Sequence, residues 1–403
     1  MKILTYSTNE EANTERNVDS IVLTDFCYVR DGSSPEKIPF YEGKDLHLYE
    51  APICSYCLTT PTTRLLCCSR CHIAWYCDSR CQKAHYKMEH KSLCNDVAKD
   101  LKRVEDEARP LHNTPFGEDP EPQNIFETQV GYFGLVPETH SYLNARRYLV
   151  ETYIHASFST EIKDVWEKAL FHALGLLRLD MNDPFDIQMI IPFILLHLNR
   201  DDDTYDFVCF WLKANTFDQE SLEKILCRSQ EGEWIYPRET SSRFDDVFEH
   251  NPALNDPDVH LAFLVAFLFL KVRLIATYDA TCKSVDFALH ETAHGPRILE
   301  VRDAVKDMLT GNMYGDIAIQ RQQVERLADL IHRINPSMLP SYLNVRRILN
   351  QKRPRTQTRG DPSEIYDILN YSNSCFLRIP GAQNMLEERF GENPTFNAQI
   401  QYT

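Results

Sequence analysis

The distribution of cysteines is the feature that most constrains this chain. Of its thirteen cysteines, eight lie between Cys54 and Cys94, and the other five are scattered over the 403 residues. A disulfide scaffold would spread its cysteines, whereas a dense cluster favours metal binding in a compartment where thiols stay reduced. The N-terminus turns polar before an apolar segment of signal-peptide length has formed. We therefore expect an intracellular protein of the cytoplasm or nucleus.

The spacing of the cluster predicts two zinc sites. Two Cys-x2-Cys pairs, a Cys-x3-Cys pair and a His-x3-Cys pair follow one another, which is enough for two tetrahedral zinc ions. If one ion takes four cysteines and the other takes three cysteines and the histidine, no coordination position is left for a substrate, so the zinc would be structural. Two neighbouring side chains compete for ligation: Cys67, which we expect to be a buried thiol, and His85, which we expect to face solvent. The candidate ligands are Cys54, Cys57, Cys68, Cys71, Cys77, Cys81, His90 and Cys94.

This spacing, together with Trp75-Tyr76-Cys77 and Cys81-Gln82, closely resembles the MYND zinc finger over residues 54–94. The resemblance implies cross-braced ligation of Zn²⁺, with two ions per chain. The chain departs from the family in two places: Tyr86 stands where the family usually has tryptophan, and the interval from Cys81 to His90 is one residue longer than is common. One ion would be held by Cys54, Cys57, Cys77 and Cys81, and the other by Cys68, Cys71, His90 and Cys94.

The same resemblance implies a class of partner. MYND fingers bind short, often proline-containing peptides of other proteins. Gln82 matches the family's glutamine and Tyr86 takes the position of its tryptophan, so we expect both side chains to contact such a peptide. The alternative for Tyr86 is simple packing over the zinc core. We therefore expect an adaptor that binds protein partners.

The charge of the chain argues against nucleic acid and membranes as partners. Forty-three basic residues against fifty-nine acidic ones give a formal charge of −16, which repels phosphate and anionic lipid. Residues 51–95 are locally basic, but these side chains offset the charge of zinc-bound thiolates. The longest apolar run, Leu261–Leu270, is too short to span a bilayer and suits a buried helix.

Hydrophobic periodicity indicates a mainly α fold after the finger. We expect a short β-prone N-terminal segment over 1–50, the finger over 51–95, a charged helix and Pro-rich linker over 96–124, and a helical domain over 125–403. Ser141–Val150 and Ser341–Asn350 match at seven positions, which favours a solenoid-like (TPR-like) domain; the alternative is an irregular helical bundle. The helices expected are Ser141–His155, Ser159–Leu179, 183–198 with a kink at Pro192, Tyr205–Lys213, Val259–Ile275, Ile298–Leu309 and Ile319–Ile334.

The helical region also resembles that of a group of fungal MYND-finger proteins. The similarity implies that finger and helices form one inherited unit, and it names no activity. The segments that carry it are Val130–Gly134, Leu198–Asp201, Tyr205–Phe207, Leu270–Leu274 and Pro380–Ala382.

Two enzyme classes are alternatives to an adaptor. His290-Glu291-Thr292-Ala293-His294 matches the zinc metalloprotease signature, but Gly295-Pro296 should end the helix there and no convincing third ligand follows. MYND fingers also occur within SET-domain lysine methyltransferases, whose Asn-His motif this chain lacks. We therefore predict that the protein is not an enzyme.

A basic run between Arg346 and Arg359 is a further candidate interaction segment. Its charge and its proline suit either a nuclear-import signal or a docking site for acidic partners. The alternative is a solvated loop without a binding role.

Overall fold

The computed structural model describes residues 48–60, 64–116, 119–213, 236–256, 258–292, 308 and 316–400. The predicted N-terminal β-prone segment therefore lies almost wholly outside the described residues. Contacts divide the described chain into two compact units, with the boundary after Leu198. The first unit holds residues 48–198, and the second holds 199–213 and the described residues from 236 onward. The helical region that was predicted as one domain, 125–403, thus contributes to both units.

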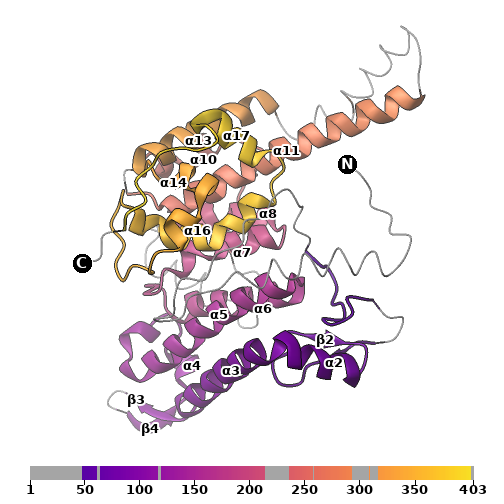
Figure 1. The fold of residues 1–403 in the computed structure, drawn as a ribbon. Coiled ribbons are helices and arrows are strands. Elements are labelled where there is room, and N and C mark those ends of the chain that lie inside the picture. The colour runs from indigo at the N-terminus through magenta and orange to yellow at the C-terminus, as the bar shows by residue number, and fades with distance from the viewer. Residues whose placement is uncertain are drawn as a thin grey trace. The chain divides into compact units, whose positions relative to one another are not determined.

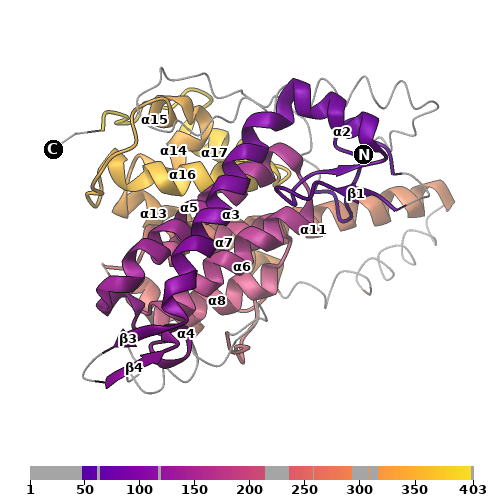
Figure 2. The same cartoon turned by 90° about the horizontal axis from the view of Figure 1, so that it is seen from below.

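The first unit joins the finger to a set of helices. Its long helix α3 begins directly after the predicted ligand His90, carries the last ligand, Cys94, in its first turn, and packs along α5 (Figure 1, Figure 2). Its elements are β1 (Leu66–Cys67), β2 (Trp75–Tyr76), α2 (Ser79–His85), the π-helical turn η1 (Tyr86–His90), α3 (Lys91–Leu111), β3 (Thr114–Phe116), β4 (Asp119–Gln123), α4 (Ile125–Thr128), η2 (Phe133–Leu135), η3 (Pro137–Thr139), α5 (His140–Thr160), α6 (Lys163–Leu179), η4 (Ile187–Met189) and α7 (Ile191–His197).

Helices α5 and α6 form an antiparallel hairpin. Near the turn, the rings of Phe158 and Trp166 meet edge to face at 5.0 Å, and further along Arg146 donates to the carbonyl of His172. The turn itself is made by Glu161, which adopts a left-handed conformation and ends α5. The apolar stripe of α6 is buried, as its 3.6-residue period predicts.

Two segments of the first unit differ from expectation. Residues 114–116 and 119–123 pair as the antiparallel strands β3 and β4, where the sequence predicted a linker. Pro192 does not kink a helix, because it lies in the first turn of α7, where its missing N–H costs nothing. The residues before it do not continue a helix, since Asp183 and Asp186 adopt left-handed conformations and the Asp183 carboxylate accepts hydrogen bonds from the backbone of Ile187 and Gln188.

The second unit is built around α11, whose first ten residues are buried on every face. The segment Leu261–Val285 is long and apolar enough to cross a membrane by length and composition, and 72% of its most apolar window is buried. The elements of the unit are α8 (Asp201–Lys213), α10 (Val247–His250), η6 (Pro252–Asn255), α11 (Leu261–Thr292), α13 (Ile317–Ile334), α14 (Met338–Ser341), η7 (Tyr342–Asn344), α15 (Arg346–Leu349), α16 (Pro362–Leu377) and α17 (Ala382–Phe390).

Three helices predicted for this unit, Tyr205–Lys213, Val259–Ile275 and Ile319–Ile334, each overlap a helix of the structure but differ from it at one or both ends. Helix α11 runs well past the predicted end at Ile275, because no proline or glycine interrupts the chain before Gly295. The stretch Ser341–Asn350 forms short pieces of helix, whereas its partner in the suggested repeat, Ser141–Val150, lies in one long helix. The predicted helix Ile298–Leu309 lies outside the described residues, apart from Met308.

Candidate metal centre

Each Cys-x2-Cys pair sits on the same kind of turn. The residue after each pair, Leu58 or His72, adopts a left-handed conformation, and its amide donates to the carbonyl of the first cysteine. These hydrogen bonds are 2.8 Å for Leu58 to Cys54 and 3.0 Å for His72 to Cys68. A closed turn of this kind holds both thiols on one side, where a single metal ion can take them.

The third pair, Cys77 and Cys81, is set by the start of α2. Asp78 caps this helix, and its carboxylate accepts hydrogen bonds from the amides of Arg80 (2.8 Å) and Cys81 (2.9 Å). Hydrogen bonds from the N-terminal amides also lower the pKa of the Asp78 carboxyl, Cys81 first among them. The cap fixes where the helix begins and thereby brings the second cysteine one turn above the first.

The last pair, His90 and Cys94, is positioned by a π-helical turn. Residues Tyr86–His90 wind with the wider π geometry before α3 begins, so the additional residue between Cys81 and His90 is accommodated without breaking the helix. His90 closes this turn, and Cys94 lies one turn later in α3. Both side chains are buried.

The eight predicted ligands gather into two groups, and within each group the ligand atoms all lie within 4.8 Å of one another. In the first group, the Sγ atoms of Cys57 and Cys77 are 3.6 Å apart. In the second, the Sγ atoms of Cys68 and Cys94 are 3.9 Å apart, and Cys71 Sγ lies 3.3 Å from His90 Nε2. The first group is Cys54, Cys57, Cys77 and Cys81, and the second is Cys68, Cys71, His90 and Cys94.

These distances fit zinc. A tetrahedral ion with Zn–S bonds of about 2.3 Å sets its sulfur atoms about 3.8 Å apart, whereas a disulfide bond is only about 2 Å long. Every cysteine of the two groups is free. The grouping is the cross-braced one that the resemblance implies, and in each group all four positions of a tetrahedral ion would be filled by protein donors.

Electrostatics favours a cation at both groups. Burial and the neighbouring Cys54 thiol raise the pKa of Cys81 to about 12, and a bound cation would reverse this shift. Burial also raises the pKa of Cys57, but hydrogen bonding with Thr59 outweighs it and brings the pKa down to about 7. Burial, aided by His85, lowers the pKa of His90 to about 4, so its imidazole is neutral at neutral pH, the state that binds metal.

The two rejected ligands lie outside the groups, yet neither has the predicted environment. Cys67 is exposed rather than buried: it lies on β1, both residues of which are exposed, and its Sγ is 3.8 Å from the carbonyl oxygen of Cys68. His85 does not face solvent: its Nδ1 lies 3.1 Å from the Tyr76 hydroxyl, and its ring stacks on His90 at 5.3 Å. The π-helical turn explains this stacking, because residues five apart lie above one another in it.

The predicted peptide contacts, Gln82 and Tyr86, are both partly exposed and lie four residues apart on α2 and the following turn. Tyr86 also meets the His90 ring at 6.3 Å, edge to face, so it packs on the zinc core and still reaches the surface. Further apolar side chains of the finger are exposed, with 44% of Tyr56, 56% of Leu66 and 68% of Met88 accessible.

The remaining sequence candidates are the motif His290–His294 and the basic run. Helix α11 ends at Thr292, and the side chains and remainder of the motif His290–His294 lie outside the described residues. In the basic run, Arg353 pairs with Asp367 at 2.9 Å and Arg359 donates to the Val259 carbonyl, so part of its charge is used within the second unit.

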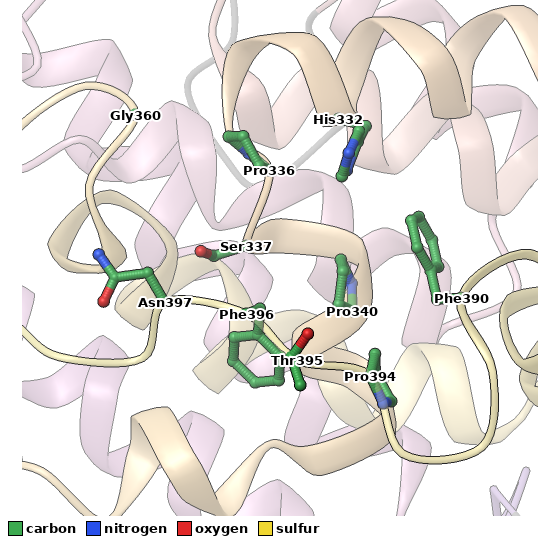
Figure 3. A pocket seen from close by; sticks show the side chains of 10 residues that line it. All are labelled: His332, Pro336, Ser337, Pro340, Gly360, Phe390, Pro394, Thr395, Phe396 and Asn397. Carbon is green, nitrogen blue, oxygen red and sulfur yellow. The ribbon is translucent and has the colours of Figure 1, made fainter.

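A pocket of about 320 Å³ lies in the second unit between the end of α13 and the C-terminal segment (Figure 3). His332 and Phe390 stand on one side of it, with their rings 5.4 Å apart, and three prolines line it. His332 is the one ionisable side chain among its lining residues, so the pocket supplies no acid–base pair.

Comparison with known proteins identifies the finger. Residues 54–94 match the family model described as MYND finger, so this part of the chain is a MYND zinc finger. Such fingers bind zinc and mediate protein–protein interactions, and the two groups can hold two metal ions. Neither the curated proteins nor the solved structures gave a match to the chain.

Proposed function

We propose that this protein is an adaptor in which the MYND finger binds proline-containing segments of partner proteins and the helical units act as a scaffold. In this proposal the protein works inside the cell by binding and has no catalytic activity. The solenoid-like character of the helices and the relationship to fungal MYND-finger proteins stay predictions.

One observation supports the proposal: protein ligands fill the coordination of both metal groups, while side chains beside them are exposed to solvent. Each group has four protein donors, so its metal would have no position for a substrate. Next to the second group, Tyr86 is partly exposed and Met88 strongly exposed. Exposed aromatic and thioether side chains are typical of surfaces that take up proline-rich or apolar peptides.

The test uses the full chain and a panel of proline-containing peptides. Tyr86→Ala and Gln82→Ala should each weaken binding of a selected peptide by about tenfold, which is the loss of one good contact of roughly 1.4 kcal/mol. The control is Tyr278→Ala, which removes the same side chain from α11 in the second unit. Binding that is unchanged in both finger variants, with zinc retained, would show that the finger does not choose the partner.

The proposal also assigns no catalytic role to Glu291. Glu291→Ala should leave every measured property of the purified protein unchanged, including any peptide cleavage seen in the preparation. A peptidase activity that disappears with this substitution would replace the adaptor proposal by the metalloprotease alternative.

A further inference from the structure

The second metal group belongs to the finger and is also connected to helices outside the motif. Cys94 lies in the first turn of α3, and the same helix continues to Leu111 along α5. Midway along it, the buried carboxylate of Asp100 accepts a hydrogen bond of 2.6 Å from the Thr152 hydroxyl of α5. The helix that carries a zinc ligand is therefore anchored to the helical hairpin.

Helix α6 contacts the finger through Lys168. Lys168 Nζ donates a 2.8 Å hydrogen bond to the carbonyl of His72, the residue that follows the ligand Cys71. The same ammonium lies 5.2 Å from the centre of the Trp75 ring and pairs with the carboxylate of Asp164 on its own helix. Lys168 thus holds the loop that supplies half of the second group.

The chain before the finger is tied to the same hairpin. The amide of Tyr49 donates to the carbonyl of Glu161 (2.8 Å), and the amide of Lys163 donates back to the carbonyl of Tyr49 (3.0 Å). The side chain of Lys163 also pairs with Glu50 at 2.6 Å. The chain before the finger is therefore fixed to the turn between α5 and α6, and the chain after it is fixed to α5 through Asp100 and Thr152.

The two metal groups differ in their surroundings. All four ligands of the second group are buried, whereas three of the four in the first group are only partly buried. Lys168 and α3 connect the second group to α5 and α6, whereas the contacts of Tyr49 and Glu50 involve the backbone and side chains that precede Cys54 and no ligand of the first group. In such sites the free energy of metal binding contributes directly to the free energy of folding. A metal group that packs against two helices therefore stabilises those helices as well.

We infer that the second metal group and the hairpin α5–α6 form one zinc-dependent folding unit, in which Lys168 is a positioning residue for the finger. The ion at the first group stabilises its own turns. The ion at the second group also stabilises residues 140–179, so the helical scaffold responds to zinc. This coupling does not depend on peptide binding and stands or falls independently of the adaptor function.

The first experiment follows zinc release and hydrogen–deuterium exchange in the full chain. On addition of EDTA, the ion of the less buried first group should leave first and that of the second group more slowly. Cys57→Ser, which retains only the second group, identifies the slow phase. Amide exchange within 140–179 should rise at least about tenfold with the slow phase and stay constant during the fast one. Unchanged exchange in 140–179 after both ions have left would overturn the inference.

The second experiment tests Lys168 itself. Lys168→Met keeps the aliphatic stem and removes the charged donor, so the slow phase of release should accelerate about tenfold while the fast phase is unchanged. Lys168→Arg, which retains charge and donors, should restore most of the slow rate. The matched control is Lys102→Met, an exposed lysine on α3, which should change neither phase.

A second variant keeps the test decisive if Lys168→Met does not fold. Thr152→Val removes the hydrogen bond to Asp100 from the α5 side and should accelerate the slow phase alone. Equal acceleration of both phases, or no acceleration in either variant, would show that the helices do not support the second group.

Discussion

At the scale of single residues, the neighbouring cysteines Cys67 and Cys68 differ in role: Cys68 belongs to a metal group, and Cys67 does not. Cys68 is 4% exposed and faces Cys94, whereas Cys67 is exposed on the outer side of β1. The amide of Cys68 donates to the carbonyl of Ala74, which fixes the orientation of the strand at this point. Both residues of β1, Leu66 and Cys67, are exposed, and burial begins at Cys68, the first residue after the strand.

The imidazole of His172 supplies a pH-dependent contribution to the stability of the first unit. Burial, with the nearby charge of Arg146, lowers its pKa to about 3 from the usual 6.5, and the ring stacks on Tyr153 at 5.5 Å. The folded state therefore excludes a proton that the unfolded state binds below about pH 6.5, so stability falls as the pH falls from there toward 3.

His172→Phe keeps a ring against Tyr153 and removes the titration. Between pH 7 and pH 5, the wild-type chain should lose about 2 kcal/mol more stability than the variant, as measured by urea unfolding of the zinc-loaded proteins. An equal loss in the two proteins would contradict the assignment of the pH dependence to His172.

At the scale of secondary structure elements, one buried lysine joins three segments of the second unit. Lys271 on α11 is 1% exposed, and its ammonium donates to the carbonyls of Arg243 and Asp245 and to the Gln320 side chain, over 2.6–2.8 Å. Burial lowers its pKa to about 8, yet at neutral pH the three acceptors still receive a charged donor.

Lys271→Met should destabilise the second unit by about 3 kcal/mol, because three buried acceptors lose their donor at once. Thermal or urea unfolding of the full chain measures the change. Lys283→Met, an exposed lysine on the same helix, is the matched control and should shift the midpoint by less than about 0.5 kcal/mol. Similar midpoints for the two variants would contradict the role of Lys271.

The elements also show where sequence patterns suffice. The 3.6-residue period predicted α6 and α13, because each has one apolar face that must be buried. It also predicted α5, although this helix is buried over more than one face and buries Arg146 and Thr152 as well. The π-helical turn before His90 could not be predicted, since it depends on the ring stacking and metal geometry that fix both of its ends. Pro192 was misassigned because a proline in a first turn and a proline in a helix interior have the same local sequence signal.

At the scale of the whole molecule, the metal ligands were the most predictable part of the function and the support around them the least. Eight ligands could be proposed because zinc sites need specific side chains at short, regular spacing. Lys168 and Thr152 carry no such signal: they lie far along the chain from the residues they contact, and only the fold brings them together. The class of partner that the finger binds is a proposal.

The central claim is that two zinc ions are held by the two groups described, and native mass spectrometry of the full chain tests it directly. The wild-type protein should carry two zinc ions, and Cys68→Ser should carry one. Cys67→Ser, which changes the neighbouring thiol, should still carry two. A wild-type chain without zinc, or a Cys67→Ser chain that loses an ion while Cys68→Ser keeps both, would contradict the account.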